Sequence, residues 1–569
     1  MRAAGRAALL ASAALIAMPA AAQVLPGAVQ PGRDRPGPAT PSQPDFDFSI
    51  VTPHRSAVPR AVDEVHFKLS DVKIVGAKTI AAAYFRPLYA GLIGKDITLG
   101  DILDIADKIE DAYRTRGYLL VRAFVPPQRV RDGVFTINVV EGYLANVTVQ
   151  GGRRGAQRLV RAYLAPATSA HPLTLAAMER GLLLTNDIPG VSASGVLKPS
   201  ASLPGASDLV VDIDQPPVSG GLAVDNRGSH FSGLWTVSGD VEFNGLLGED
   251  QLAATVVSSP DSLRQIEGTV RYRRAIGGDG LIGSLIGTVT HGEPGSLLSV
   301  AGVLTHSWAA GARLTYPLIR SRAQTLLLDG GFTAQDATVN VSGLGHHLSH
   351  DQWRVIDLGA SYQQTGLLGG GIWTTTFDIA RGLSIFGATD DTVPAAAPPH
   401  APQPNPDLSR FRGKTDFTKF TAGTRLLLPI GGNFSTALNV QGQFALDRLI
   451  TGEQIAFGGT QIGRGYDPGA ITGDHGVGGS AELRYDFRFA DSVVRAVEPY
   501  VYVDGAQTWY FVDPSLPNQT LLSAGGGFRF WLPYNLTGAI EGSRMLRAVP
   551  GSDLGRKATK VLFDLSVRF

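Results

Sequence analysis

The feature that most constrains the fold is an alternation of apolar and polar residues that recurs from residue 216 to the C-terminus. In FSTALNVQGQFAL (434–446), one face carries Phe434, Leu438, Val440 and Phe444. In AELRYDFRF (481–489), the polar face holds Glu482, Arg484, Asp486 and Arg488. Successive side chains of a strand point to opposite faces of a sheet. This region is therefore predicted to be β-sheet with one apolar and one highly charged face.

The charge on the polar face favours a membrane barrel over a soluble sandwich. A sandwich packs its apolar face against a second sheet. A membrane barrel instead turns apolar residues toward lipid and polar residues into its lumen. The pattern covers about 350 residues, which at about 22 residues for a strand and its loop corresponds to roughly 16 antiparallel strands. We therefore predict that residues 216–569 form a transmembrane antiparallel β-barrel in an outer membrane.

The end of the chain, KVLFDLSVRF, is an amphipathic strand that finishes on an aromatic residue. An apolar residue occupies every second position, and the last is Phe569. A terminal aromatic on such a strand is typical of outer-membrane barrels. We expect the barrel-assembly machinery to recognise a signal made of Phe563, Leu565, Val567 and Phe569.

The N-terminal 63 residues are predicted to be a signal peptide and a tether. Residues 1–22 place two arginines ahead of a short apolar run that ends in small residues, a secretory pattern with cleavage before Gln23. The run is too short for an uncleaved membrane anchor. Residues 23–63 are rich in proline, which lacks the backbone N–H that helices and sheets use. We expect this segment to be extended and to lack packed elements.

Two small α+β modules are predicted between the tether and the barrel, at residues 64–142 and 143–215. In the first, ITLGDILDIADKIEDAYRTRGY (97–118) has apolar residues at helical spacing, and Thr98 and Asp101 have the spacing of a capping box. Strands are expected on both sides of this helix. The second module repeats the pattern more faintly, with helices near 155–164 and 173–186. Each module has too little core to be an enzyme.

Composition and motifs argue against catalysis and cofactors. Lys+Arg and Asp+Glu both number 50, so no net field favours nucleic acid. There is no cysteine, which excludes disulfides and thiolate catalysis. Asp474 and His475 lack a G-x-S-x-G nucleophile motif, so a lipase triad is not supported. The three histidines of GLGHHLSHDQW (343–353) are expected to stay unliganded. We expect no enzyme activity, no cofactor, no metal site and no nucleic-acid partner.

The arrangement and several motifs resemble the haemolysin secretion/activation family of two-partner secretion transporters, from about residue 64 to the C-terminus. In that family, POTRA (polypeptide-transport-associated) modules precede a barrel. The first module matches through LIGKDITLGDILDIADKIEDAYRTRGYLLVRAFVPPQ and VVEG, and the opening of the barrel matches through VDNRGSHFSGLWTVSGDVEFNGLLGEDQL. IGRGYDPG is similar to the family's loop motif, and YVYVDGAQTW to its aspartate-bearing strand motif.

The resemblance implies that the loop near 458–476 folds inward through the barrel and meets the inner wall. The residues expected to form this lock are Gly463, Arg464, Gly465, Tyr466 and Asp504. The alternation of residues is consistent with this contact, because it places Asp504 on the lumen face while Val501 and Val503 face lipid. An arginine suits this contact because its guanidinium is always charged and binds a carboxylate at two points. Ala506 departs from the family, which usually has glycine there.

The resemblance further implies an outer-membrane pore that binds an unfolded exoprotein through periplasmic modules and passes it to the cell surface. The expected partners are the exoprotein, outer-membrane lipids and the barrel-assembly machinery. We expect the exoprotein to add a strand to a module edge, at LLVRAFV or VFTINVV, with contacts at Leu119, Val121, Phe124, Phe135 and Ile137. Ordinary sheet core is the alternative for these residues. The alternative functions are a barrel-assembly factor and a passive porin.

Overall fold

The structure is a computed structural model that describes residues 47–50 and 66–569. The gaps in the second range are 201–202, 204, 261–264, 296, 343–346, 394–402, 491, 512–516 and 550–557. The predicted signal peptide and most of the predicted tether lie outside the described residues.

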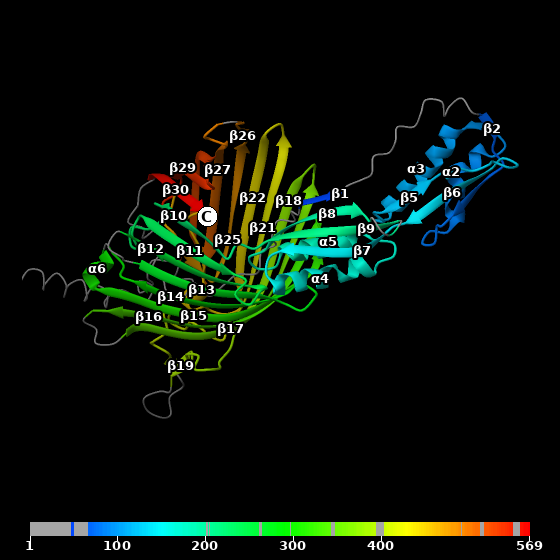
Figure 1. Cartoon of the computed structure of the whole chain (residues 1–569). Coiled ribbons are helices and arrows are strands. Elements are labelled where there is room, and N and C mark those ends of the chain that lie inside the picture. The colour runs from blue at the N-terminus through cyan, green and yellow to red at the C-terminus, as the bar shows by residue number, and fades with distance from the viewer. Residues whose placement is uncertain are drawn as a thin grey trace, which may run out of the picture.

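The C-terminal part forms a closed antiparallel barrel (Figure 1). We count sixteen strands in the described part of the chain, taking β25 and β26 as one because both pair with β27. This confirms the predicted architecture and strand number. The strands are β10 (Val218–Asp225), β11 (Thr236–Asn244), β12 (Asp250–Ser258), β13 (Gln265–Ile276), β14 (Leu281–Gly292), β15 (Val303–Arg320), β16 (Gln324–Val341), β17 (His347–Leu367), β18 (Gly371–Gly382), β21 (Thr418–Gly431), β22 (Phe434–Ala445), β25 (His475–Tyr485), β26 (Phe487–Arg488), β27 (Ala496–Trp509), β28 (Gln519–Trp531), β29 (Leu536–Met545) and β30 (Thr559–Arg568).

The barrel closes where the first strand meets the last. β10 pairs with β30 from Gly221↔Arg568 to Asp225↔Asp564. The seam continues to the terminal residue, because Phe569 and Gly220 exchange two backbone hydrogen bonds of 3.0 Å. The Phe569 side chain itself is exposed, as is that of Val561. An antiparallel strand paired on both sides leaves no free sheet edge, as a membrane barrel requires.

The two faces of the barrel strands differ as the alternation predicts. On β22, Leu438 and Phe444 are exposed on the outer surface while Gln443 is buried. On β27, Val501 and Val503 are exposed while Asp504 is buried. Large apolar side chains would be unfavourable in water over so wide a surface. They are favourable against lipid, so the outer face is a membrane-facing belt.

The first α+β module packs one long helix against a small sheet. Its elements are β2 (His66–Lys68), β3 (Asp71–Val75), η4 (Ala82–Phe85), α2 (Arg86–Tyr89), η5 (Ala90–Leu92), β4 (Asp96–Thr98), α3 (Leu99–Thr115), β5 (Val121–Phe124) and β6 (Val134–Glu141). α3 begins with the predicted capping box between Thr98 and Asp101. Its apolar face, including Ile102 and Ile109, is buried in the module core. No helix in the described residues is both long and apolar enough to cross a membrane.

The predicted exoprotein contacts in this module need correction. The sheet order is β3-β6-β5, so VFTINVV forms a central strand that pairs on both sides and cannot accept another. Phe135 and Ile137 lie on this strand and are buried in the core, as is Val121 on β5. Alternation identified a strand but could not tell an edge from a centre. Of the two candidate strands only β5 is an edge, with Phe124 exposed and Leu119 half-buried just before it.

Glu141 ties the end of β6 to the start of the module. Its carboxylate accepts hydrogen bonds from the backbone amides of Lys78 and Thr79, both at 2.8 Å, and from the Tyr113 hydroxyl at 2.6 Å. Burial alone would raise the pKa of Glu141, but the hydrogen bonds from Tyr113, Thr79 and Lys78 outweigh it and lower the pKa. The resulting stabilisation is complete above the ordinary glutamate pKa and is lost as the pH falls through the lowered value.

We therefore expect Glu141→Gln to loosen this module at pH 7. The amide keeps one acceptor oxygen but loses the charge, and the loss is about 1 kcal/mol at most because the group is partly solvated. Hydrogen–deuterium exchange of the intact protein at residues 78–79 measures the effect. Glu179→Gln, in the second module, serves as a control that leaves those amides protected. Unchanged exchange in Glu141→Gln would contradict the expected role of the charge.

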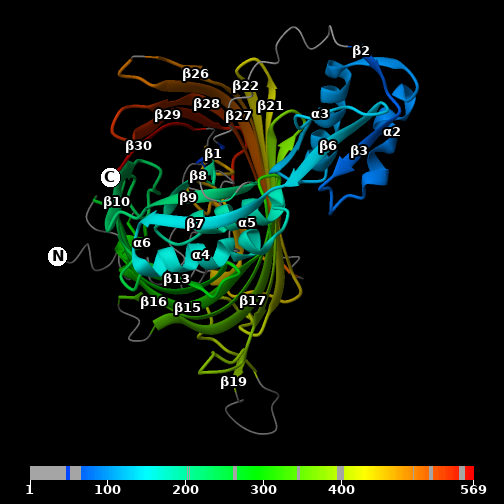
Figure 2. The same cartoon turned by 45° about the vertical axis from the view of Figure 1, so that its right-hand side comes forward.

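The second α+β module lies across one end of the barrel (Figures 1 and 2). It consists of β7 (Tyr143–Gly151), α4 (Arg154–Ser169), α5 (Leu175–Asn186), β8 (Ser192–Pro199) and β9 (Ala206–Asp214). Arg320, at the end of β15, holds Asp187 through two hydrogen bonds of 2.7 and 2.8 Å. Arg180 donates to the Pro317 carbonyl at 2.9 Å. These contacts fix α5 over the turns between barrel strands.

One packed element occurs where the tether was predicted to have none. Asp47–Ile50 forms a short strand, β1, that pairs in parallel with β8. The sheet order of the second module is therefore β1-β8-β9-β7. The expectation failed because proline density was averaged over the whole segment. Residues 45–52 between Pro44 and Pro53 contain no proline and keep every backbone N–H.

Candidate functional site: a loop held inside the barrel

The segment between β22 and β25 folds into the barrel and fills part of its lumen. It contains a 3₁₀ turn, η6 (Thr451–Glu453), and a small hairpin made of β23 (Ile455–Phe457) and β24 (Ile471–Gly473). Phe457, Ile462 and Ile471 are buried with Leu521 and Met545 of the barrel wall. The apolar side chains of the loop therefore pack against the wall, and its tip is presented at a defined place.

The tip of this loop requires glycine on both sides of Arg464. Gly463 has φ +86°, a left-handed conformation that side chains disfavour. A Cβ on Gly465 would lie 3.0 Å from Ser523 Cβ and 3.1 Å from the Met545 backbone nitrogen. The two glycines therefore let the backbone turn tightly and approach β28 and β29 closely. This local geometry directs the long Arg464 side chain along the inner wall.

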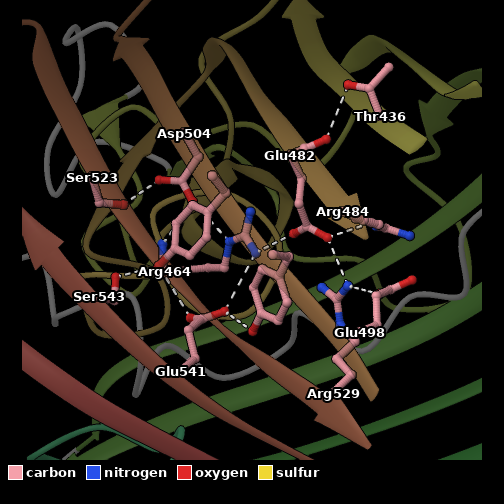
Figure 3. Close-up of polar contacts among 12 residues, drawn as sticks. Thr436, Arg464, Glu482, Arg484, Glu498, Asp504, Ser523, Arg529, Glu541 and Ser543 are labelled. Atoms are coloured by element: carbon pink, nitrogen blue, oxygen red, sulfur yellow. Dashed lines mark hydrogen bonds and ion pairs between the residues drawn. The ribbon is translucent and has the colours of Figure 1, made fainter. Parts of the chain in front are cut away.

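Arg464 is buried among three carboxylates from three different strands (Figure 3). Its Nε lies 3.1 Å from Asp504 Oδ2 on β27, and its backbone amide donates to the same oxygen at 3.3 Å. Its Nη1 lies 2.8 Å from Glu482 Oε2 on β25 and 3.5 Å from Glu541 Oε2 on β29. The guanidinium thus contacts several acids and does not form the predicted bidentate pair with Asp504.

Aromatic and polar side chains complete the setting of Arg464. The Tyr502 ring lies beneath its guanidinium, 3.3 Å from ring centroid to Cζ, a cation–π contact. The Tyr502 hydroxyl donates to Ser543 at 2.6 Å, and Ser523 donates to Asp504. Glu482 is shared with Arg529 at 2.8 Å and Arg484 at 2.6 Å. Each buried acid therefore has a cation or a hydroxyl beside it, as burial of charge demands.

Tyr466 anchors the chain just beyond the arginine. Its ring is buried, and its hydroxyl accepts from the Leu522 amide at 3.1 Å and faces the carbonyls of Leu522, at 2.9 Å, and Arg547. The structure therefore brings all five predicted lock residues together. That these residues act as a lock stays a prediction.

Ala506, the departure from the family's usual glycine, fits the barrel wall because Gly478 lies opposite it in the strand register and leaves room for its methyl group.

A second set of buried charges holds the base of the loop, and sequence reasoning missed it. Asp474 accepts from Arg410 Nη1 at 2.5 Å and from the backbone amides of Leu449 at 3.0 Å and Phe511 at 2.7 Å. Glu453 pairs with Lys419 at 2.7 Å and accepts from Trp353 Nε1 at 2.9 Å. Asp474 thus connects the two ends of the loop to each other, through Leu449, and to the segments that carry Arg410 and Phe511.

The flank of the loop has its own anchor. Asp467, just past Tyr466, pairs with Lys560 of β30 and with the His230 ring in the loop that follows β10. The loop is thereby tied to β30 and to the loop that follows β10, as well as to β25, β27 and β29. These partners lie from 18 to 237 residues away in sequence from the loop residues that they contact. Alternation marks residues such as Glu482 as lumen-facing, and for Asp504 the resemblance to a known family adds a second signal.

Comparisons with known proteins match this architecture. Residues 205–530 match the family model described as haemolysin secretion/activation protein ShlB/FhaC/HecB, and residues 67–142 match the ShlB-type POTRA domain. The heme/hemopexin transporter protein HuxB of Haemophilus influenzae (strain 86-028NP) is 23% identical over 518 residues, covering 86% of this chain and 85% of that protein. The outer membrane transporter CdiB of Escherichia coli is 22% identical over 472 residues, covering 81% and 76%.

A solved structure shares the fold. CdiB from Escherichia coli superposes with a TM-score of 0.68 at 21% identity, covering 91% of this chain and 93% of that one. The family model spans more than half of the chain and includes the strand that bears Asp504 and the loop that bears Arg464. The chain therefore belongs to the haemolysin secretion/activation protein family, outer-membrane transporters that translocate exoproteins through a β-barrel preceded by periplasmic POTRA domains.

Proposed function

We propose that the inward loop is the lock of the translocation path and that the POTRA modules deliver an unfolded exoprotein to it. The observation that supports this proposal is the buried Arg464 at the loop tip, which is tied to the inner wall by Asp504, Glu482 and Glu541. A polypeptide that passes through the lumen must displace this loop or share the lumen with it. Separating these ion pairs requires new partners for the buried charges, and polar groups of a passing polypeptide are able to supply them.

The surroundings of the barrel suggest its other partners. The apolar outer belt is suited to outer-membrane lipids. The terminal strand, with Phe563, Leu565, Val567 and Phe569, is suited to recognition by the barrel-assembly machinery. In the closed barrel the Phe569 backbone pairs with Gly220, and its side chain is 72% exposed. The ring therefore contributes little to the stability of the closed barrel, and it is accessible to the assembly machinery before the seam forms.

The test of the transport proposal compares culture supernatants of cells that contain the intact chain, none, or a chain lacking residues 64–215. We expect one large exoprotein to be missing from the medium in both defective strains. Loss of many other barrels from the outer membrane would instead indicate a barrel-assembly factor. Continued uptake of a small solute by the truncated barrel, with an unchanged set of secreted proteins, would indicate a passive porin.

The proposed assembly role of Phe569 makes a separate prediction. We expect Phe569→Ala to lower the amount of barrel in the outer membrane several-fold, while the barrel that does insert resists heating in detergent as the wild type does. Phe444→Ala is the matched control, because Phe444 is also an outward aromatic on the lipid face but lies far from the terminus. Equal amounts of both variants would contradict a terminal signal, and quantitative blots of membrane fractions provide the measurement.

A further inference from the structure

A short protrusion interrupts the barrel sheet on its outer surface, just after β18 ends. Leu383 still pairs with β17, since its amide donates to the Arg354 carbonyl at 2.8 Å. Thr389 pairs with β17 again, since its amide donates to the Gln352 carbonyl at 2.8 Å. Residues 384–388, which we call the outer strap, therefore leave the sheet and return to it within a few residues.

The outer strap lies at the end of the barrel that faces away from the periplasm. β15 ends at the turn where Arg320 holds Asp187 of the second module. Because neighbouring barrel strands are antiparallel, β16 and β18 both end at the opposite rim. A small strand in the same connection, β19 (Thr392–Val393), lies away from the second module in Figures 1 and 2. The strap is therefore on the side of the outer leaflet.

A tight turn places an aromatic side chain at the tip of the strap. The Ala388 amide donates to the Ile385 carbonyl at 3.1 Å, and the residues between them have positive φ, +49° at Phe386 and +77° at Gly387. Positive φ at both central residues is the pattern of a type I′ turn, which phenylalanine disfavours and glycine accepts. Phe386 is nevertheless 78% exposed. Packing within the protein therefore does not explain an aromatic residue at this position.

The Phe386 ring extends the lipid-facing surface of the barrel. It contacts Phe332 of β16 edge-on, with ring centroids 6.3 Å apart. Phe332 points outward, because Thr333 beside it is buried on the lumen side and successive side chains of a strand alternate. Ile356, the partner of Phe332 on β17, is exposed in the same surface. The strap is therefore continuous with the apolar belt that the membrane covers.

Two arginines lie beside this apolar surface. Arg381 is exposed and stands directly opposite Ile356 in the register, and its Nη1 donates to Thr418 Oγ1 at 2.7 Å. Arg354 lies under the strap and is 7% exposed. It donates to the Phe386 carbonyl at 3.2 Å and to two other backbone carbonyls. In the part of the chain that the structure describes, neither arginine has a carboxylate within ion-pair distance.

The two arginines differ in what they still offer to a ligand. Arg354 gives its donors to backbone carbonyls and so holds the strap against β17. Arg381, as far as the described residues show, contacts Thr418 through a single nitrogen, which leaves the rest of its guanidinium open to a ligand. An arginine keeps its charge and binds a phosphate through two parallel N–H donors. A phosphate that carries apolar chains therefore matches both Arg381 and the apolar residues beside it.

We propose that Arg381, Ile356, Phe332 and Phe386 form a binding site for a phosphorylated lipid of the outer leaflet. The phosphate lies on the Arg381 guanidinium, and an acyl chain lies along Ile356 and Phe332 with the Phe386 ring against it. Directly opposite residues of neighbouring strands have Cβ atoms about 5 Å apart, so a single amphiphile reaches both the cation and the apolar side chains. This site goes beyond the proposed transport function and does not depend on it.

Retention of lipid A by the purified full-length protein tests the site. Lipid A, whose phosphates are linked to a sugar that carries acyl chains, is the probe, and the same lipid freed of phosphate is the control ligand. Native mass spectrometry of the protein in mixed micelles measures how much of each lipid stays bound. Inorganic phosphate in excess distinguishes a lipid site from a site for any phosphate. The variants are Arg381→Gln, Arg381→Lys and Phe386→Ala.

We expect Arg381→Gln to weaken the binding of lipid A about tenfold, because hydrogen bonds to a charged group are lost. Arg381→Lys keeps the charge without the planar fork and should bind with intermediate strength. Phe386→Ala should weaken binding by less than Arg381→Gln does, because detergent replaces part of the lost apolar contact. The dephosphorylated lipid should bind the wild type no better than lipid A binds Arg381→Gln.

Two matched variants control for charge and for aromatic character. Arg544 is also an exposed, outward arginine at the outer end of a strand, β29, so Arg544→Gln removes the same charge elsewhere. Phe444 is also an exposed aromatic at the outer end of a strand, β22, so Phe444→Ala removes a ring far from the strap. Both should bind lipid A as the wild type does. Resistance of each variant to heating in detergent confirms that the barrel is folded.

The outcomes that would overturn the site are distinct from failure of export. Absence of retained lipid A in the wild type, or equal retention of the dephosphorylated lipid, excludes phosphate recognition. Weakening in Arg544→Gln as large as in Arg381→Gln indicates a diffuse attraction to cations and excludes a defined site. Displacement of lipid A by inorganic phosphate indicates a site for free anions. Each of these results leaves the transport proposal as it stands, because secretion of the exoprotein is measured separately.

Discussion

Arg464→Ala is expected to stop export while leaving the barrel in the outer membrane. The change removes the only cation that contacts Asp504 among the ion pairs of the described residues, and it leaves Glu541 and Glu482 with fewer partners. Removing one member of such a buried cluster costs about 3 kcal/mol, mostly because the remaining charges are stranded. The loop tip then loses its ion pairs to β25, β27 and β29. Supernatant content and single-channel conductance of the purified barrel measure the two consequences.

Two further variants identify the cause of that loss. Arg464→Lys keeps the charge but has no planar group to divide between Asp504 and Glu482 or to stack on Tyr502, so we expect intermediate export. Arg464→Ala combined with Asp504→Asn should destabilise the tip by less than the sum of the single changes, because the stranded charge is removed as well. Arg488→Ala is the matched control, since Arg488 is an exposed arginine that pairs only with Asp486 among the described contacts. Wild-type export in Arg464→Ala would contradict the lock.

Much of this fold follows from local sequence patterns. The alternation on β22 and β27 records which residues face lipid, because that face repeats every second residue and the environment on each side is uniform. The helical spacing in α3 and its capping box are equally local. β1 was not predicted, because its four residues lie among many prolines and form a strand only when β8 supplies a partner.

The candidate site was predictable in part. Alternation and the resemblance to a known family placed Asp504 opposite Arg464, and the structure shows the contact. Glu541 was missed because its closeness to Arg464 depends on the register of β27, β28 and β29, which no local pattern fixes. Asp474 and Glu453 were missed for the same reason, since their partners Arg410, Lys419 and Trp353 come from other strands and loops.

Loss of the contacts at the base of the loop should have a different effect from loss of the contacts at its tip. Asp474 is fully buried and holds Arg410, which is itself 6% exposed, together with two backbone amides. Arg464 at the tip lines a cavity together with Tyr500 and Arg529, whereas Asp474 is held by two backbone amides as well as by an arginine. We infer that the base is a permanent anchor and the tip a releasable one.

Asp474→Asn is therefore expected to destabilise the folded barrel as well as to impair export. The amide has nearly the same shape but leaves the buried Arg410 guanidinium without its counter-charge, a loss of about 3 to 5 kcal/mol. The temperature at which the barrel loses its compact, fast-migrating form in detergent should fall clearly, and surface protease should cut the loop in intact cells. Asp486→Asn is the matched control, because Asp486 also pairs with an arginine but in an exposed position where ion pairs contribute little. If Asp474→Asn instead loses export while its heat resistance falls no further than that of Arg464→Ala, the base and the tip form one releasable unit and the loop leaves the barrel as a whole.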